Sequence, residues 1–163
     1  MRLDQRRGDF EELHTAQALA PLIRAAQPDI DVDRELPGSL VEELTGRGMF
    51  RLLLPQSLGG SQLSLPKFIR CIEAIAEADG SAGWCVGQGG VFANSADGMA
   101  PELVADIWGR NPAAVVATGT PSECEAQARD GAFELTGQWR FASGCMHADW
   151  LAAMANLVHA DGS

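Results

Sequence analysis

The chain has 163 residues, 46% of them hydrophobic and 21% charged, a composition that argues against a disordered protein and allows a sizeable buried core. Its formal net charge of -10 argues against a nucleic-acid partner and against binding to anionic membranes, because both attract clustered basic side chains. The first ten residues lack the apolar stretch of a signal peptide or membrane span, so we expect a cytoplasmic protein that does not enter a membrane.

Helical spacing dominates the first 112 residues of the sequence. Apolar side chains recur every three or four positions over residues 9–27, and Pro28 is expected to end this helix because proline lacks the amide hydrogen that a helix needs. Ser39 and Ser64 are the expected N-caps of the next two helices. The further helices are predicted over residues 39–46, 64–80, 81–96 and 101–109.

The hydrophobic period changes after residue 112. Residues 113–119 form the continuous apolar run of a buried strand, and Asp130 and Gly131 predict a tight hairpin turn with positive backbone angles. Helices followed by strands predict an α+β fold, with a helical domain at 1–112 and part of a β domain at 113–163. The further strands are predicted over residues 124–129, 132–136, 139–143 and 150–158.

Several common functional motifs are missing from the sequence. The glycine-rich residues 87–90 do not lie between a strand and a helix, so close helix packing explains them better than phosphate binding. Glu77 and Asp79 are expected at a solvated helix end rather than as an acid-base pair. No metal site or disulfide framework is expected, because the cysteines lack the required spacing; they are Cys71, Cys85, Cys124 and Cys145.

Two segments carry a family resemblance. Residues 54–60 (LPQSLGG) and 137–144 (GQWRFASG) resemble proteins of the acyl-CoA dehydrogenase fold, and residues 139–150 are more similar to two-component flavin-dependent hydroxylases than to dehydrogenases. Dehydrogenases of this superfamily usually carry a Thr-Glu-Pro step in the first strand, whereas residues 118–123 read TGTPSE. The resemblance therefore favours a monooxygenase.

The resemblance implies a fold and an activity. We expect an all-α N-terminal domain followed by the first strands of an antiparallel, barrel-like middle domain, with the C-terminal four-helix domain of the family absent. Such hydroxylases take reduced FAD or FMN from a separate flavin reductase, form a flavin hydroperoxide and insert oxygen into an aromatic or polycyclic small molecule. Members of the family are commonly tetramers, so a homo-oligomer is expected for the full-length protein.

The resemblance also implies a cofactor site at the ends of the strands. A flavin ring needs an apolar wall and hydrogen-bond donors, and strand ends can supply both. Ser143 is the expected catalytic residue, placed to reach the flavin N5 atom. Cys145 and His147 are expected to be an inert thiol and an ordinary satisfied or surface histidine. The implied cofactor-binding residues are Thr118, Gly119, Trp139, Phe141, Ser143 and Gly144.

Two alternatives stay open at this point. One is an acyl-CoA dehydrogenase, which the first strand argues against, and the other is a non-catalytic truncated or accessory subunit. No general base is evident, because His14 and His159 are poorly placed and the family base usually comes from the C-terminal domain. The isolated chain is therefore expected to bind flavin weakly or not at all and to be inactive.

Overall fold

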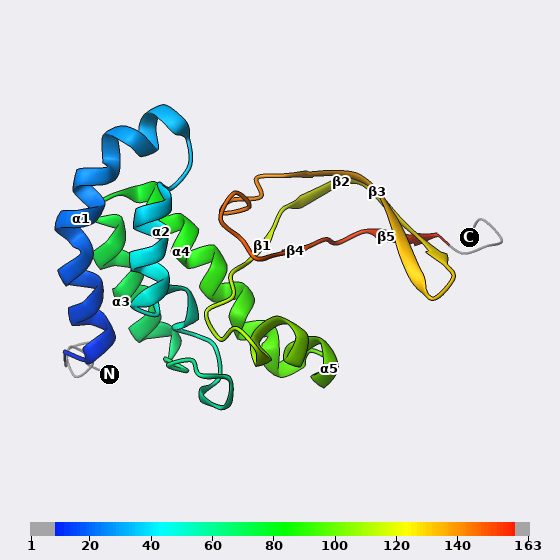
Figure 1. Ribbon diagram of the computed structural model, residues 1–163, viewed down its shortest axis with the longest axis horizontal. Coiled ribbons are helices and arrows are strands. Elements are labelled where there is room, and N and C mark those ends of the chain that lie inside the picture. The colour runs from blue at the N-terminus through cyan, green and yellow to red at the C-terminus, as the bar shows by residue number, and fades with distance from the viewer. Residues whose placement is uncertain (1–8, 159–163) are drawn as a thin grey trace, which may run out of the picture.

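The computed structural model describes residues 9–158, with a group of helices from which the strands extend to one side (Figure 1). Helices come first in the chain and strands afterwards, so the protein is α+β as predicted. No described helix is long and apolar enough to cross a bilayer. The helical elements are α1 (Glu11–Asp33), α2 (Gly38–Gly46), η2 (Met49–Arg51), η3 (Gln56–Leu58), α3 (Leu65–Ala76), α4 (Gly80–Ala93), η4 (Asn94–Gly98), α5 (Pro101–Val104) and η5 (Ala105–Gly109).

Helix α1 is longer than the sequence predicted. Pro28 lies inside it, as does Pro21, and the helix ends only at Arg34, whose backbone has a φ of 58°. Both prolines are exposed, where water can solvate the carbonyl groups that they leave without an amide partner. Ile30, beyond the second proline, is buried in the core, and this burial stabilises the last turn of the helix.

The helix N-termini also differ from prediction in two places. Helix α2 begins after Pro37 and not at Ser39, and no side chain caps it. Asp79 is not a solvated residue, since it is only 7% exposed and its Oδ1 accepts a hydrogen bond of 2.8 Å from the Ala82 amide. It is therefore the N-cap of α4, which explains why a carboxylate is buried there. Ser64 does occupy the N-cap position of α3, but its side chain makes no capping hydrogen bond.

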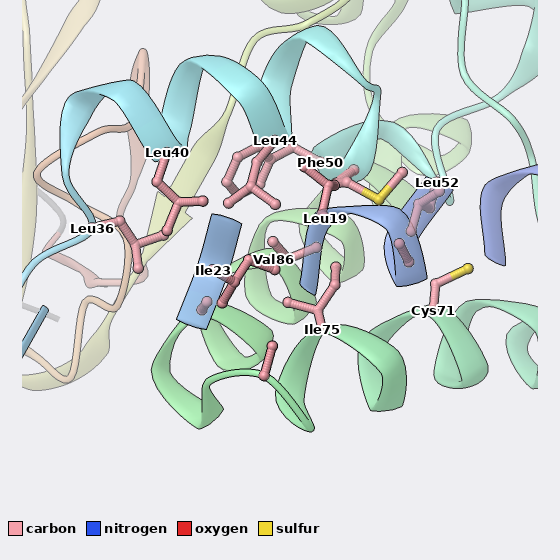
Figure 2. Close-up of a cluster of buried hydrophobic side chains, with 14 of the residues drawn as sticks. Leu19, Ile23, Leu36, Leu40, Leu44, Phe50, Leu52, Cys71, Ile75 and Val86 are labelled. Carbon is pink, nitrogen blue, oxygen red and sulfur yellow. The ribbon is translucent and has the colours of Figure 1, made fainter. Parts of the chain in front are cut away.

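The helices share one hydrophobic core. Apolar side chains from α1, α2, α3 and α4 point toward one another there, as Figure 2 shows. Burial of each large aliphatic side chain contributes about 1.5–3 kcal/mol before entropy is counted, so this core stabilises the helical part. Its buried members include Leu19, Ile23, Leu40, Leu44, Phe50, Ile75 and Val86.

Glycines bring helix α4 close to its neighbours. A Cβ atom on Gly83 would lie 2.6 Å from the Cβ of Ala76, and one on Gly90 would lie 2.7 Å from Cε2 of Phe68. Neither distance is possible for real atoms without movement. The prediction of close packing for residues 87–90 is confirmed at Gly89 and Gly90, but not at Gly87, where the nearest atom would be 3.9 Å away.

The strands form two small sheets and no closed barrel in the part of the chain that the structure describes. β1 pairs with β4 in parallel, while β2 pairs with β3 antiparallel and with β5 in parallel. Asp130 and Gly131 have φ angles of 47° and 82°, so the predicted hairpin turn is confirmed. The strands are β1 (Val116–Thr118), β2 (Thr120–Arg129), β3 (Ala132–Arg140), β4 (Trp150–Ala152) and β5 (Asn156–Val158).

The predicted strand over residues 139–143 does not exist as a separate element. Trp139 and Arg140 complete β3, and the backbone of Phe141 then turns with a φ of 53°, which is incompatible with a strand. Residues 141–149 form a loop between β3 and β4. This loop lies where the predicted functional residues are concentrated.

Candidate functional site

The loop of residues 141–149, which we call the β3–β4 loop, has a backbone fixed by consecutive turns. The amide of Ser143 donates to the carbonyl of Phe141 at 2.8 Å, and the amide of Cys145 donates to the carbonyl of Ala142 at 3.0 Å. Gly144 has a φ of 85°, and a Cβ there would lie 3.1 Å from Nε2 of His147. Glycine is therefore needed both for the backbone angle and for the histidine ring beside it.

Asp149 joins the end of this loop to the start of β1. Its Oδ2 accepts a hydrogen bond of 2.9 Å from the Val115 amide, and its own amide donates to the Val115 carbonyl at 2.9 Å. Val115 belongs to the helical core, so the loop is tied directly to the helical part of the protein. No local sequence pattern indicates this bond, because its partners are 34 residues apart.

Trp84 makes the second long-range bond to the loop. Its indole Nε1 donates to Oγ of Ser143 at 2.9 Å, a contact between α4 and the β3–β4 loop across 59 residues. The Trp84 side chain is otherwise poorly covered, since the residue is 59% exposed. Sequence reasoning placed this tryptophan in a buried helix and missed its role; a large aromatic residue among glycines and alanines was the available signal.

A cavity of about 390 Å³, which we call the helix-side cavity, lies between α4 and the loop. It is lined on one side by the end of α1 and the start of α4, including Trp84 and Cys85, and on the other by residues 142–147. Its size falls within the range of small-molecule pockets. The walls combine apolar side chains with the Ser143 hydroxyl and with the charged residues Arg34 and Glu35.

A second cavity of about 600 Å³, which we call the strand-side cavity, lies against the strands. Its lining is mostly apolar and comes from β1, β3, β4 and the loop. Ala142 and Cys145 line both cavities, so the β3–β4 loop forms a wall between them. Cys145 is exposed and is not packed into a core as the sequence suggested.

The structure divides the predicted cofactor-binding residues into three groups. Thr118, Gly119 and Trp139 line the strand-side cavity, whereas Ser143 and Gly144 line the helix-side cavity. Phe141 lines neither cavity and is 88% exposed.

Two of the residues on the strand-side cavity have close contacts of their own. A Cβ on Gly119 would lie 2.9 Å from the Arg140 carbonyl oxygen, so glycine allows the backbones to approach. The Trp139 indole donates to the Met154 carbonyl at 2.9 Å, which fixes its ring beside the cavity.

His147 is not the ordinary satisfied or surface histidine that the sequence predicted. Its Nε2 is buried and has no hydrogen-bond partner within the described part of the chain. Burial lowers the pKa of His147, against a smaller opposing effect of the Glu35 carboxylate. The ring lies against Phe50, with centroids 5.5 Å apart, so a neutral imidazole is held against the edge of the helical core.

Two cysteines of the helical part of the protein are poorly suited to nucleophilic chemistry. Burial raises the pKa of Cys85, and the nearby Asp79 carboxylate raises it further. Burial likewise raises the pKa of Cys71 to about 11. Because the thiolate is the reactive form, both cysteines are unreactive near neutral pH. Ser143 and His147 also line the helix-side cavity.

Comparison with known proteins finds flavin-dependent relatives, although no family model matches the chain. Indole-3-acetate monooxygenase of Pseudomonas putida is 33% identical over 126 residues, which cover 77% of this chain and 32% of that protein. The flavin-dependent monooxygenase oxygenase subunit HsaA of Rhodococcus jostii is 30% identical, over 89% of this chain and 38% of that subunit.

Solved structures agree with these relatives. The 3-HSA hydroxylase from Rhodococcus sp. has a TM-score of 0.86 and 29% identity, over 95% of this chain and 40% of that one. XiaF from Streptomyces sp., solved with FADH2 and glycerol, has a TM-score of 0.88 at 21% identity and supports the fold alone. The chain is similar to oxygenase components of flavin-dependent monooxygenases. It spans about a third of the length of the curated relatives it matches.

Proposed function

We propose that this chain provides part of a flavin-dependent oxygenase that hydroxylates an aromatic or polycyclic substrate. The similarity over most of the chain to several monooxygenases carries the proposal. One further relative, 30% identical, is named as the oxygenase component of an FADH2-dependent resorcinol hydroxylase from Rhizobium sp.. Reduced FAD or FMN would come from a separate flavin reductase, which is the expected protein partner.

The residues of the β3–β4 loop fit a flavin ring. Phe141 is 88% exposed, and the partly exposed ring of Trp84 contacts the Ser143 hydroxyl. Aromatic side chains are suitable walls for a planar heterocycle, and a hydroxyl beside one can bond to its polar edge. The two cavities beside the loop are each large enough to hold part of a ligand of this size.

We assign the roles within the site as follows. Ser143 is the catalytic residue, because its hydroxyl would bond to the reacting edge of the flavin. A bound reduced flavin would supply the electrons that activate molecular oxygen. The backbone turns of the loop hold Ser143 in place, and the Trp84 indole contacts its hydroxyl. The assigned cofactor-binding residues are Thr118, Gly119, Trp139, Phe141, Ser143 and Gly144.

The wider architecture belongs to the same proposal. Residues 1–112 would be the N-terminal helical domain, and residues 113–163 part of a barrel-like middle domain of the acyl-CoA dehydrogenase superfamily. The Thr118-Gly119-Thr120 sequence at the end of β1 supports an oxygenase over a dehydrogenase of that superfamily. A cytoplasmic homo-oligomer would complete the site.

The test measures flavin binding and product formation. Reduced and oxidised FAD and FMN are titrated anaerobically into the chain, with tryptophan fluorescence as the readout. We expect weak, saturable binding of reduced flavin that Ser143→Ala weakens. Labelled oxygen is then supplied with indole-3-acetate, resorcinol or p-hydroxyphenylacetate, and the incorporated label is measured by mass spectrometry.

Two results would overturn the proposal. The first is binding of reduced flavin that Ser143→Ala leaves unchanged in a chain that keeps its helical circular dichroism. The second is bleaching of oxidised FAD by an acyl thioester without oxygen, which would show a dehydrogenase.

A further inference from the structure

The hydrogen bond between Trp84 and Ser143 determines what the serine can do. We infer that Trp84 is a positioning residue, which fixes the Ser143 hydroxyl so that its proton is donated to an acceptor atom of the bound ligand. The inference rests on the proposed function, since that ligand is taken to be the flavin.

The direction of the bond follows from the chemistry of the two groups. An indole N–H can only donate, so Oγ of Ser143 must be the acceptor in the 2.9 Å contact. A serine hydroxyl has one proton and two acceptor sites, and Trp84 uses one of the acceptor sites. The hydroxyl proton therefore points elsewhere. No protein acceptor takes it within the described residues, although the hydroxyl lines the helix-side cavity.

The same bond fixes the position of the hydroxyl. The backbone at Ser143 is already held by the turn to Phe141, so only rotation about the Cα–Cβ bond remains. The bond to Trp84 selects one rotamer. Accepting this bond also polarises the hydroxyl, which makes it a stronger donor.

Packing alone does not account for Trp84. The residue is 59% exposed, so its ring contributes less to the core than a buried tryptophan would. Its one polar atom is used on Ser143. The indole thus has a specific contact with the proposed catalytic residue and comparatively little burial.

The inferred role can be tested by comparing how tightly the chain binds oxidised and reduced flavin. The N5 atom of oxidised flavin accepts a hydrogen bond, whereas N5 of reduced flavin carries a proton and donates. A serine held as a donor should therefore favour the oxidised form at that atom. Trp84→Phe keeps one aromatic ring and removes the N–H together with the second ring of the indole, so it releases the hydroxyl and keeps part of the wall.

The experiment combines a measurement without flavin and one with it. In the flavin-free chain, Ser143→Ala should shift the nitrogen-15 resonance of the Trp84 indole and leave those of Trp108, Trp139 and Trp150 in place. With flavin, Trp84→Phe should weaken binding of the oxidised form by about 3- to 10-fold, with a smaller effect on the reduced form. The same substitution should have no further effect in a Ser143→Ala background. Trp150→Phe is the control, because the Trp150 indole makes no hydrogen bond within residues 9–158.

The outcomes separate the two claims. Suppose that the unsubstituted chain binds flavin and that Ser143→Ala weakens this binding. If Trp84→Phe then has no effect on affinity, or if its effect adds to that of Ser143→Ala in the double variant, the positioning role is wrong and the proposed function stands. An unchanged indole resonance in Ser143→Ala would also reject the positioning role. If the folded chain binds flavin and Ser143→Ala leaves the affinity for both forms unchanged, both claims fail.

Discussion

Regularly spaced apolar side chains occur in both the helical and the strand region of this protein, but they are buried in the helices and partly exposed on the strands. In the helices, side chains such as Leu19, Leu44 and Ile75 are buried against one another. In the sheet of β2, β3 and β5, the register places Leu135 and Leu157 on the same face as Ala126, yet Leu135 and Leu157 are each 48% exposed. The sequence pattern shows which face is apolar, and only a packing partner decides whether that face is buried.

Truncation of one side chain in each region tests this contrast most strongly. Ile75→Ala should lower the free energy of unfolding by about 2–5 kcal/mol, because it opens a cavity in the helical core. Leu135→Ala should cost less than about 1 kcal/mol, because the side chain is already half in solvent. Urea unfolding followed by circular dichroism measures both. Equal losses would show that the face of β3 is covered in solution.

Two glycines on α4 sharpen the comparison within the helical region. Gly83→Ala should destabilise the protein by about 1–3 kcal/mol, since the new methyl group would meet Ala76 at 2.6 Å. Gly87→Ala is the matched change on the same helix, where the nearest atom is 3.9 Å away on Ile72. It should stabilise the helix by about 0.5–1 kcal/mol. The same sign for both substitutions in thermal unfolding would contradict the packing described here.

The joint between the two regions gives a smaller effect. Asp149→Ala should cost about 1 kcal/mol, because the buried Val115 amide loses its carboxylate acceptor. Asp149→Asn keeps an oxygen in that place and should recover most of the loss. Hydrogen exchange of the Val115 amide reports directly on its hydrogen bond to Asp149. Protection of this amide that survives in Asp149→Ala would contradict the prediction.

The pH dependence of stability is the smallest predicted effect. Burial lowers the pKa of His147 below its ordinary value of 6.5, so the unfolded chain takes up this proton more readily as the pH falls. The contribution of the neutral ring is present above pH 6.5 and is lost as the pH falls from there toward the lowered pKa. His147→Gln should flatten this dependence in urea unfolding series. His14→Gln, at an exposed histidine, is the control, and an unchanged slope in His147→Gln would reject the assignment.

Local features of the fold could be predicted from the sequence, whereas nonlocal ones could not. The hairpin at Asp130 and Gly131 depends on two adjacent residues with a strong conformational preference, and it was predicted correctly. The predicted end of α1 at Pro28 was wrong, because tertiary burial of Ile30 outweighed the local effect of the proline. Burial of Asp79 was missed because its capping role depends on where α4 begins.

The candidate site follows the same rule. A resemblance in one short segment directed attention to Ser143, but the residue that contacts it comes from a helix 59 positions earlier. The unsatisfied Nε2 of His147 likewise depends on packing against the helical core, which no local pattern encodes.

Strand β3 has a consequence for how the protein behaves at high concentration. Within the described residues it is a nine-residue strand at the edge of its sheet, and Phe133 beside the hairpin is 63% exposed. Such an edge presents unpaired amide and carbonyl groups that can template a strand from another molecule. The ion pair of Arg129 and Glu134 places charges at this end of the strand, where they oppose intermolecular pairing. We therefore expect removal of these two charges to lower the solubility of the protein at high concentration.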